Sequence, residues 1–219
     1  MTVDANDTLD AGPFGQWLAE IQGAIRGGHD SDVPCGTCTG CCRSSQFVHI
    51  GPDETDALAH IPKQLLFPAP RAPHGHLLMG YDEQGRCPML IDDRCSIYEH
   101  RPSTCRTYDC RVFEASGLDL LDDPDKSPIA DRAARWRFRN VGPSDDAQHQ
   151  AVRAAAAFVR DHHDELPPEL APMNTTQLAV VAIQTHEAFL VDGSAAIDDP
   201  VPEPTVDAVI VALRRCSRG

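Results

Sequence analysis

The chain has 219 residues, and its 33 acidic against 19 basic side chains give a formal net charge of −14 at pH 7. A protein whose main task is to bind nucleic-acid phosphates needs a net or clustered positive surface, so this charge argues against nucleic acid as a partner. No run approaches the ~18 consecutive apolar residues of a transmembrane helix, so we expect no membrane partner either.

The N-terminal segment MTVDANDTLDAG has acidic residues where a secretory signal needs a basic region followed by an apolar run. We therefore expect a cytoplasmic protein. Disulfides are unusual in a reducing cytosol, so the nine cysteines of this chain point to metal or redox chemistry.

The first half of the chain is expected to begin with an amphipathic helix over 13–26, with Pro13 in its first turn and Gly27 and Gly28 at its end. SQFVHI is then typical of a short strand and PDETDALAHI of a short helix. The proline-rich PKQLLFPAPRAPH predicts an extended loop, and HLLMGYDEQGRCPML predicts a hairpin that turns at DEQG. The pair Asp92 and Asp93 indicates another turn.

Beyond about residue 115 the sequence changes to an alanine-rich helical pattern, with Cys216 as its one cysteine. Helices are expected over 127–139, 144–164, 174–191 and 204–215. They are separated by the breaks GP, LPPELAP and DDPVPEP.

Eight of the nine cysteines form two groups of candidate metal ligands. A C-x2-C step lets the chain turn and brings two thiolates onto one metal, as in zinc knuckles. Gly36 and Gly40 lack a Cβ, so each can take positive φ and free backbone N–H groups to point at thiolate sulfur. The first group is Cys35, Cys38, Cys41 and Cys42, and the second is Cys87, Cys95, Cys105 and Cys110.

The adjacent pair Cys41 and Cys42 is the most informative feature of the first group. Neighbouring side chains point to opposite faces of an extended segment and diverge by about 100° in a helix, so the two thiols are poorly placed to chelate one tetrahedral ion together. Two four-sulfur sites that share this loop are the simplest solution. A single cluster with redundant or supporting cysteines remains an alternative.

The identity of the metal stays open. The first group departs from the bacterial ferredoxin run C-x2-C-x2-C-x3-C-P, because its fourth cysteine follows the third directly and is trailed by Arg43. The spacings of the second group fit no standard zinc finger. Zinc and iron, including a [4Fe–4S] cluster, are both candidate cofactors.

The motifs CGTCTGCCR, CPML and CSIYEHRPSTCRTYDC resemble the YkgJ-type cysteine-cluster family, a group of zinc- or iron-chelating domains with a CxxCxxCC signature, over residues 35–113. The resemblance implies a metal centre at all eight cysteines. Flagellin lysine N-methylases have a similar cysteine pattern, which implies an alternative class: a metal-dependent enzyme, either a protein-lysine N-methylase that uses S-adenosylmethionine or an iron-dependent redox catalyst. The chain has no GxGxxG after a strand and no P-loop, which weakens the methylase alternative.

Several other side chains could support such a centre. Cationic donors would offset the negative charge of a tetrathiolate site, and Arg43, Arg101 and Arg106 are the candidates. A histidine could replace a thiolate, and the candidates are His49, His60, His74, His76 and His100. A basic-aromatic cluster on the predicted 127–139 helix could contact RNA or an acidic partner, or else pair with the chain's own carboxylates: Arg132, Arg135, Trp136, Arg137, Phe138 and Arg139.

Taken together, these patterns predict an α+β protein with a small, irregular, metal-stabilised cysteine-rich module with short strands, packed with a mainly helical C-terminal half. The expected domains are an N-terminal helix over 1–30, a zinc- or iron-chelating domain over 31–115 and a helical region over 116–219. The expected function is metal binding by the cysteine cluster, with metal ions as partners. An enzyme, and a module that docks an unidentified protein, are the alternatives.

Overall fold

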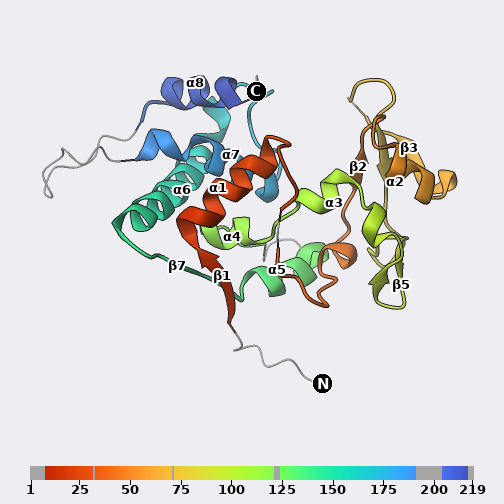
Figure 1. Cartoon of the computed structure of the whole chain (residues 1–219). Coiled ribbons are helices and arrows are strands. Elements are labelled where there is room, and N and C mark those ends of the chain that lie inside the picture. The colour runs from red at the N-terminus through yellow and green to blue at the C-terminus, as the bar shows by residue number, and fades with distance from the viewer. Residues whose placement is uncertain (1–7, 32, 71, 121–123, 191–203, 217–219) are drawn as a thin grey trace, which may run out of the picture. The chain divides into compact units, whose positions relative to one another are not determined.

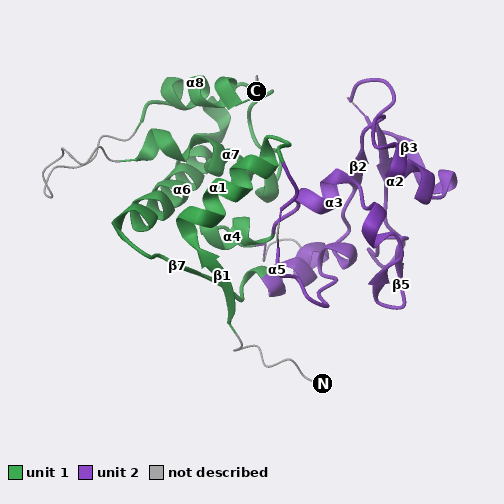
Figure 2. Ribbon diagram, viewed as in Figure 1, with its two compact units in different colours: residues 1–28, 110–119, 133–219 green, residues 29–109, 120–132 purple. Residues whose placement is uncertain are grey.

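The computed structural model describes residues 8–31, 33–70, 72–120, 124–190 and 204–216, with the path shown in Figure 1. They form two compact units (Figure 2). Unit 1 combines residues 1–28, 110–119 and 133–219, and unit 2 combines 29–109 with 120–132. The acidic segment 1–7 and the break DDPVPEP, except Pro204, lie outside the described residues.

Unit 1 is mainly helical. The longest helix, α6, contacts α1, α4 and α7, and α7 also contacts α8. The helices are α1 (Phe14–Ile25), α4 (Arg111–Ser116), α6 (Pro143–Asp161), α7 (Thr175–Thr185) and α8 (Val206–Cys216), with 3-10 turns η5 (His163–Glu165) and η6 (His186–Phe189). The four predicted helices 13–26, 144–164, 174–191 and 204–215 are thus confirmed, except that 174–191 ends in the 3-10 turn η6.

Helix α6 shows why the sequence predicts these helices well. Pro143 occupies the first turn after an extended Gly142, and two aspartates follow in that turn, where the helix dipole favours negative charge. Small apolar residues recur three and four positions apart and are buried, which gives the helix one continuous apolar face. These residues are Ala151, Val152, Ala155, Ala156 and Val159.

Unit 1 also contains a two-stranded parallel sheet. One of its strands lies in the second half of the predicted 127–139 helix, so that prediction is wrong there. The helix α5 (Ser127–Ala133) ends early, and β7 (Trp136–Arg139) pairs with β1 (Leu9–Pro13). In β7 the side chains alternate, because Trp136 is buried while Arg137 is exposed, so the arginines do not line a helix face. Arg139 forms an ion pair with Asp10 at 3.2 Å.

Unit 2 contains a three-stranded antiparallel sheet in the order β2–β4–β3. Its strands are β2 (Val48–Ile50), β3 (Leu66–Pro68) and β4 (Leu77–Met79), with α2 (Thr55–His60) and η2 (Lys63–Leu65) between β2 and β3. The predicted proline-rich loop therefore contains a strand. The predicted turn at DEQG forms, with the Gly85 N–H donating to the Asp82 carbonyl at 2.9 Å, but β4 pairs with β2 and β3 instead of forming the predicted hairpin.

Most of α5 also belongs to unit 2. The other elements of unit 2 are short, and the unit has a small apolar core. They are η1 (Cys41–Arg43), β5 (Leu90–Ile91), β6 (Arg94–Cys95), η3 (Tyr98–His100), α3 (Ser103–Thr107) and η4 (Pro124–Lys126). The core comprises Val48, Ile50, Ile61, Met79, Met89 and Ile97, and Cys87, Cys95 and Cys105 pack against it. About half of the described residues are in helices or 3-10 turns, and a few short strands accompany them. This confirms the expected α+β class. Among the described residues, no helix is long and apolar enough to cross a membrane.

Candidate metal centre

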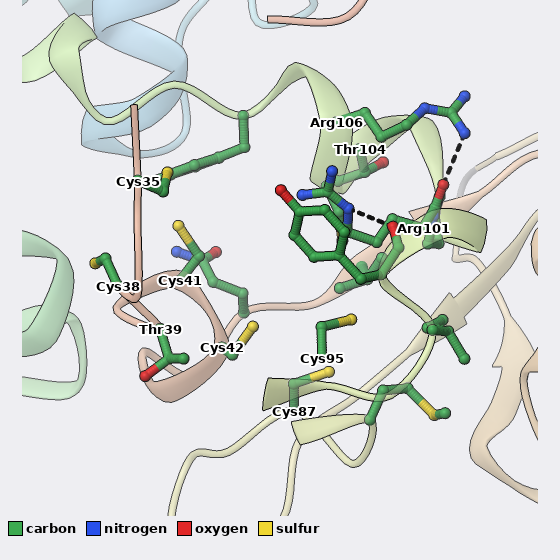
Figure 3. A pocket seen from close by; sticks show the side chains of 18 of the residues that line it. Cys35, Cys38, Thr39, Cys41, Cys42, Cys87, Cys95, Arg101, Thr104 and Arg106 are labelled. Carbon is green, nitrogen blue, oxygen red and sulfur yellow. Dashed lines mark hydrogen bonds between the residues drawn. The ribbon is translucent and has the colours of Figure 1, made fainter. Parts of the chain in front are cut away.

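Seven of the eight candidate cysteines line one pocket of about 630 Å³ in unit 2 (Figure 3). They arrive on four separate segments: the loop that ends in η1, the turn before β5, the strand β6 and the helix α3. The seven are Cys35, Cys38, Cys41, Cys42, Cys87, Cys95 and Cys105. Cys110 is not among the lining residues.

The first cysteine loop has the local geometry of a metal knuckle. The Cys38 N–H donates to the Cys35 carbonyl at 3.0 Å, and Gly36 has φ 58°, a conformation that L residues rarely adopt. The Gly40 N–H donates to the Cys38 sulfur at 3.4 Å, the backbone-to-sulfur contact expected near a thiolate. The backbone of Gly40 has the right-handed helical conformation, with φ −51°, so the expectation of positive φ is wrong there. A Cβ on Gly40 would lie 2.8 Å from the carbonyl oxygen of Pro128.

This loop is anchored by residues 126–129. Ser44 is fully buried, and its hydroxyl donates to the Gly40 carbonyl at 2.8 Å and accepts from the Ile129 N–H at 3.2 Å. The Lys126 ammonium donates to the carbonyls of Ser44 and Ser45 at 2.7 and 3.0 Å. Sequence reasoning missed Ser44 and Lys126, because neither stands in a motif and the contact spans more than 80 positions.

A tight hairpin positions two cysteines of the second group. Strands β5 and β6 pair with Ile91 opposite Arg94, and the turn residues Asp92 and Asp93 both have positive φ, 48° and 57°. Two central residues with positive φ are the mark of a type I′ hairpin turn. The turn predicted at this pair is therefore confirmed, and it holds Cys95 beside the segment that carries Cys87.

Four of the pocket thiols act on one another electrostatically. Burial, the largest cause, raises the pKa of Cys42 to about 12 together with the neighbouring Cys87, Cys95 and Cys38, while Arg101 opposes the shift. Burial likewise raises the pKa of Cys105 to about 12, with contributions from Cys87, Cys42 and Cys95. Burial also raises the pKa of Cys87, although hydrogen bonds from the backbone N–H groups of Met89 and Leu90 act in the opposite direction. Cys42, Cys87, Cys95 and Cys105 are called the inner group below.

The remaining three pocket cysteines, Cys35, Cys38 and Cys41, form an outer group. Cys35 and Cys41 are exposed and Cys38 is half-buried. In Figure 3 the Cys42 side chain turns toward Cys87 and Cys95, whereas Cys41 turns toward Cys35 and Cys38. The adjacent cysteines thus face different sulfur neighbours, as expected from the divergence of consecutive side chains.

The donor set suits zinc or iron, because soft thiolates select zinc and iron–sulfur centres. A single zinc ion with Zn–S bonds of about 2.3 Å needs its sulfurs about 3.8 Å apart. Among the described residues, no three cysteine sulfurs lie within 4.8 Å of one another. One zinc ion would therefore draw the thiols together, whereas an iron–sulfur cluster places each cysteine on its own iron.

The arginines expected beside the centre differ in their contacts. Arg101 stacks on Tyr98, with its guanidinium carbon 3.7 Å from the ring centroid, and its charge favours the thiolate forms of Cys42 and Cys105. Arg106 pairs with Asp30 at 3.0 Å and donates to the Arg101 carbonyl. Arg43 pairs with Asp93 and donates to Thr39 at 3.1 Å.

Cys110 and Cys216 both lie in unit 1. Cys110 is buried, and its sulfur accepts a hydrogen bond from the Trp136 indole N–H at 3.2 Å. Cys216, at the end of α8, is exposed and donates to the Gln184 carbonyl at 3.5 Å. All nine cysteines are thiols, with no disulfide between them.

The candidate histidines lie elsewhere in unit 2, and none lines the pocket. His49 and His76 contact one another through ring nitrogens 3.0 Å apart. His60 and His100 stack, with ring centroids 3.5 Å apart. His74 is exposed.

Comparison with known families bears on the cysteine loop and the segments that follow it. Residues 34–126 match the family model CxxCxxCC, described as a "putative zinc- or iron-chelating domain". The resemblance seen in the sequence is thereby confirmed for this segment. The matched segment contains both cysteine groups and extends to Lys126, which anchors the first loop. No curated protein matches the chain. No solved structure matches it.

Proposed function

We propose that the chain binds zinc or iron through thiolates of the unit 2 pocket, and that the inner group Cys42, Cys87, Cys95 and Cys105 ligates one centre. The observation that carries the proposal is the convergence of four segments of a zinc- or iron-chelating domain on one pocket. The mutual electrostatic effects of the inner thiols support this choice of ligands.

A bound metal ion supplies the positive charge that lets these thiols ionise. Burial holds the pKa of Cys42 and Cys105 at about 12, so the thiols are protonated at neutral pH without a metal. Because thiolates are the ligands, metal binding releases protons. Arg101 offsets part of the remaining negative charge, since a divalent ion with four thiolates carries a net charge of −2.

The outer group, Cys35, Cys38 and Cys41, provides three thiolates on the other side of the η1 loop. In the proposal they bind a second ion or extend the first centre, and Cys41 and Cys42 are the point where the two groups meet.

Metal analysis of protein purified without oxygen tests the proposal. Brown protein with iron and sulfide in stoichiometric amounts would identify an iron–sulfur cluster, and colourless protein with bound zinc would identify a zinc site. Protein that contains neither metal, stays folded with a strong chelator and takes up neither ion on reconstitution would refute the proposal.

Serine variants test the ligand assignment. Cys87→Ser combined with Cys95→Ser should remove the metal of the inner group, whereas Cys216→Ser, which changes an exposed thiol in unit 1, should leave the metal content unchanged. Circular dichroism in the far ultraviolet checks that each variant is folded. Full metal content in the Cys87→Ser/Cys95→Ser protein would contradict the assignment of the inner group.

A further inference from the structure

A second cluster of potential ligands lies in unit 2, on the surface formed by α2 and η3. Asp56 and His60 stand four positions apart on α2, so their side chains share one face of the helix. His100 ends η3, which packs against α2. One ligand atom from each of the three residues lies within 4.8 Å of the other two, and no other such group of three occurs among the described residues.

Both imidazoles turn Nδ1 toward Asp56. The His60 Nδ1 lies 2.9 Å from the Asp56 carbonyl oxygen, and the His100 Nδ1 lies 2.9 Å from the Asp56 carboxylate. Both Nδ1 atoms therefore point at oxygens of Asp56, and an ion bound among these atoms would take the place of any Nδ1 proton. The His60 Nδ1 also lies 3.7 Å from a carboxylate oxygen of Asp56, so the two ring nitrogens and the carboxylate gather at one point.

The cluster is accessible and separate from the thiol pocket. The side chains of Asp56, His60 and His100 are 67%, 41% and 39% exposed, and none of the three lines the pocket. The carboxylate is ionised, because its bond to His100 lowers the Asp56 pKa, and the nearby Arg106 contributes in the same direction. The cluster therefore offers two imidazole rings and one ionised carboxylate to solvent.

We propose that Asp56, His60 and His100 form a surface site for a divalent transition metal ion such as Zn²⁺ or Co²⁺, independent of the thiolate centre. Two imidazoles and a carboxylate suit ions of intermediate softness, which distinguishes this site from one for Ca²⁺ or Mg²⁺. The two rings are now nearly parallel, at 4°, and the lone pairs of parallel rings do not converge. Binding rotates the exposed rings apart, and water completes the coordination.

A cobalt titration of the full-length protein without oxygen separates the two kinds of site. Cobalt bound to thiolates gives a sulfur-to-metal charge-transfer band, which nitrogen and oxygen ligands do not give. Total bound Co²⁺ is measured by equilibrium dialysis. We expect one Co²⁺ to bind in addition to those reported by the plateau of the charge-transfer band.

Single variants assign that additional ion. His60→Ala and His100→Ala should each weaken its binding by about tenfold or more, because even the loss of an outer partner of a metal ligand commonly costs that much. The charge-transfer plateau should not change. His74→Ala, which removes an exposed imidazole outside the cluster, should leave the additional ion bound.

Two results would overturn the proposal: no additional ion in the unmodified protein, or equal affinity for that ion in both variants of the cluster. Absence of the charge-transfer band, with a cobalt ion that depends on His60 and His100 still bound, would support the surface site and would argue against a thiolate site for single divalent ions.

Discussion

The adjacent cysteines of the first loop should differ sharply in chemical reactivity once the metal is removed. Burial raises the pKa of Cys42 from an ordinary 9.0 to about 12, whereas Cys41 is exposed. At pH 8 a pKa of about 12 leaves about 10³-fold less thiolate than a pKa of 9.0. A more basic thiolate is a better nucleophile by about 0.4–0.5 log units per pKa unit, so the net slowing of alkylation is about 50-fold.

The assay is alkylation of the metal-free protein by iodoacetamide without oxygen, with each cysteine followed by tandem mass spectrometry. Cys42 should react about 50-fold more slowly than an ordinary thiol, and its rate should keep rising about tenfold per pH unit between pH 8 and 10. An ordinary thiol levels off above pH 9 or so. Equal rates for Cys41 and Cys42, or a Cys42 rate that levels off near pH 9, would refute the assignment of Cys42 to the buried side of the pocket.

Three further outcomes are expected. Cys110→Ala should leave the metal content unchanged but lower the free energy of unfolding by about 1–3 kcal/mol, measured by urea denaturation, because the buried Trp136 N–H loses its acceptor. Burial lowers the pKa of His149 from 6.5 to about 4, so the unfolded chain takes up a proton at His149 more readily than the folded protein does between these pH values. The free energy of unfolding should therefore fall by about 3 kcal/mol as the pH falls from 6.5 toward 4. His149→Leu should flatten that loss, measured by urea denaturation at a series of pH values. Gly40→Ala should cost about 1–3 kcal/mol and weaken metal binding, because its Cβ would meet the Pro128 carbonyl at 2.8 Å; Gly142→Ala, where no atom lies within 4 Å, is the control. Metal loss in Cys110→Ala, an unchanged pH profile for His149→Leu or a neutral Gly40→Ala would each contradict the corresponding argument.

The helices of unit 1 could be predicted because their signals are local. In α7, the Asn174 side chain accepts from the Gln177 N–H at 2.9 Å at the start of the helix, and apolar residues then recur at helical spacing. The alternation in WRFR is equally local, but four residues are too few to outweigh the helical pattern before them. Strand β7 exists because it pairs with β1, more than 120 positions earlier, and no local pattern encodes such a partner.

The cysteine site could be predicted as a set of ligands but not as an arrangement. Spacing and the adjacent pair indicate metal binding and two directions of approach. They do not indicate that burial separates Cys42 from Cys41, or that Cys110 belongs to unit 1, where it accepts a hydrogen bond from Trp136, because these facts depend on the folded core. The surface cluster of Asp56, His60 and His100 had a weak signal in the four-residue spacing on α2, and its third member is distant in sequence.

The chain passes from one unit to the other four times, because residues 110–119 and 133–219 belong to unit 1 while 120–132 returns to unit 2. An expressed fragment that ends at Lys126, where the CxxCxxCC match ends, would lose Ile129, whose N–H binds the buried Ser44 hydroxyl. A fragment extended to residue 132 would keep that bond but would include 110–119 without the helices that α4 packs against. Neither unit can therefore be excised from the chain by a single cut.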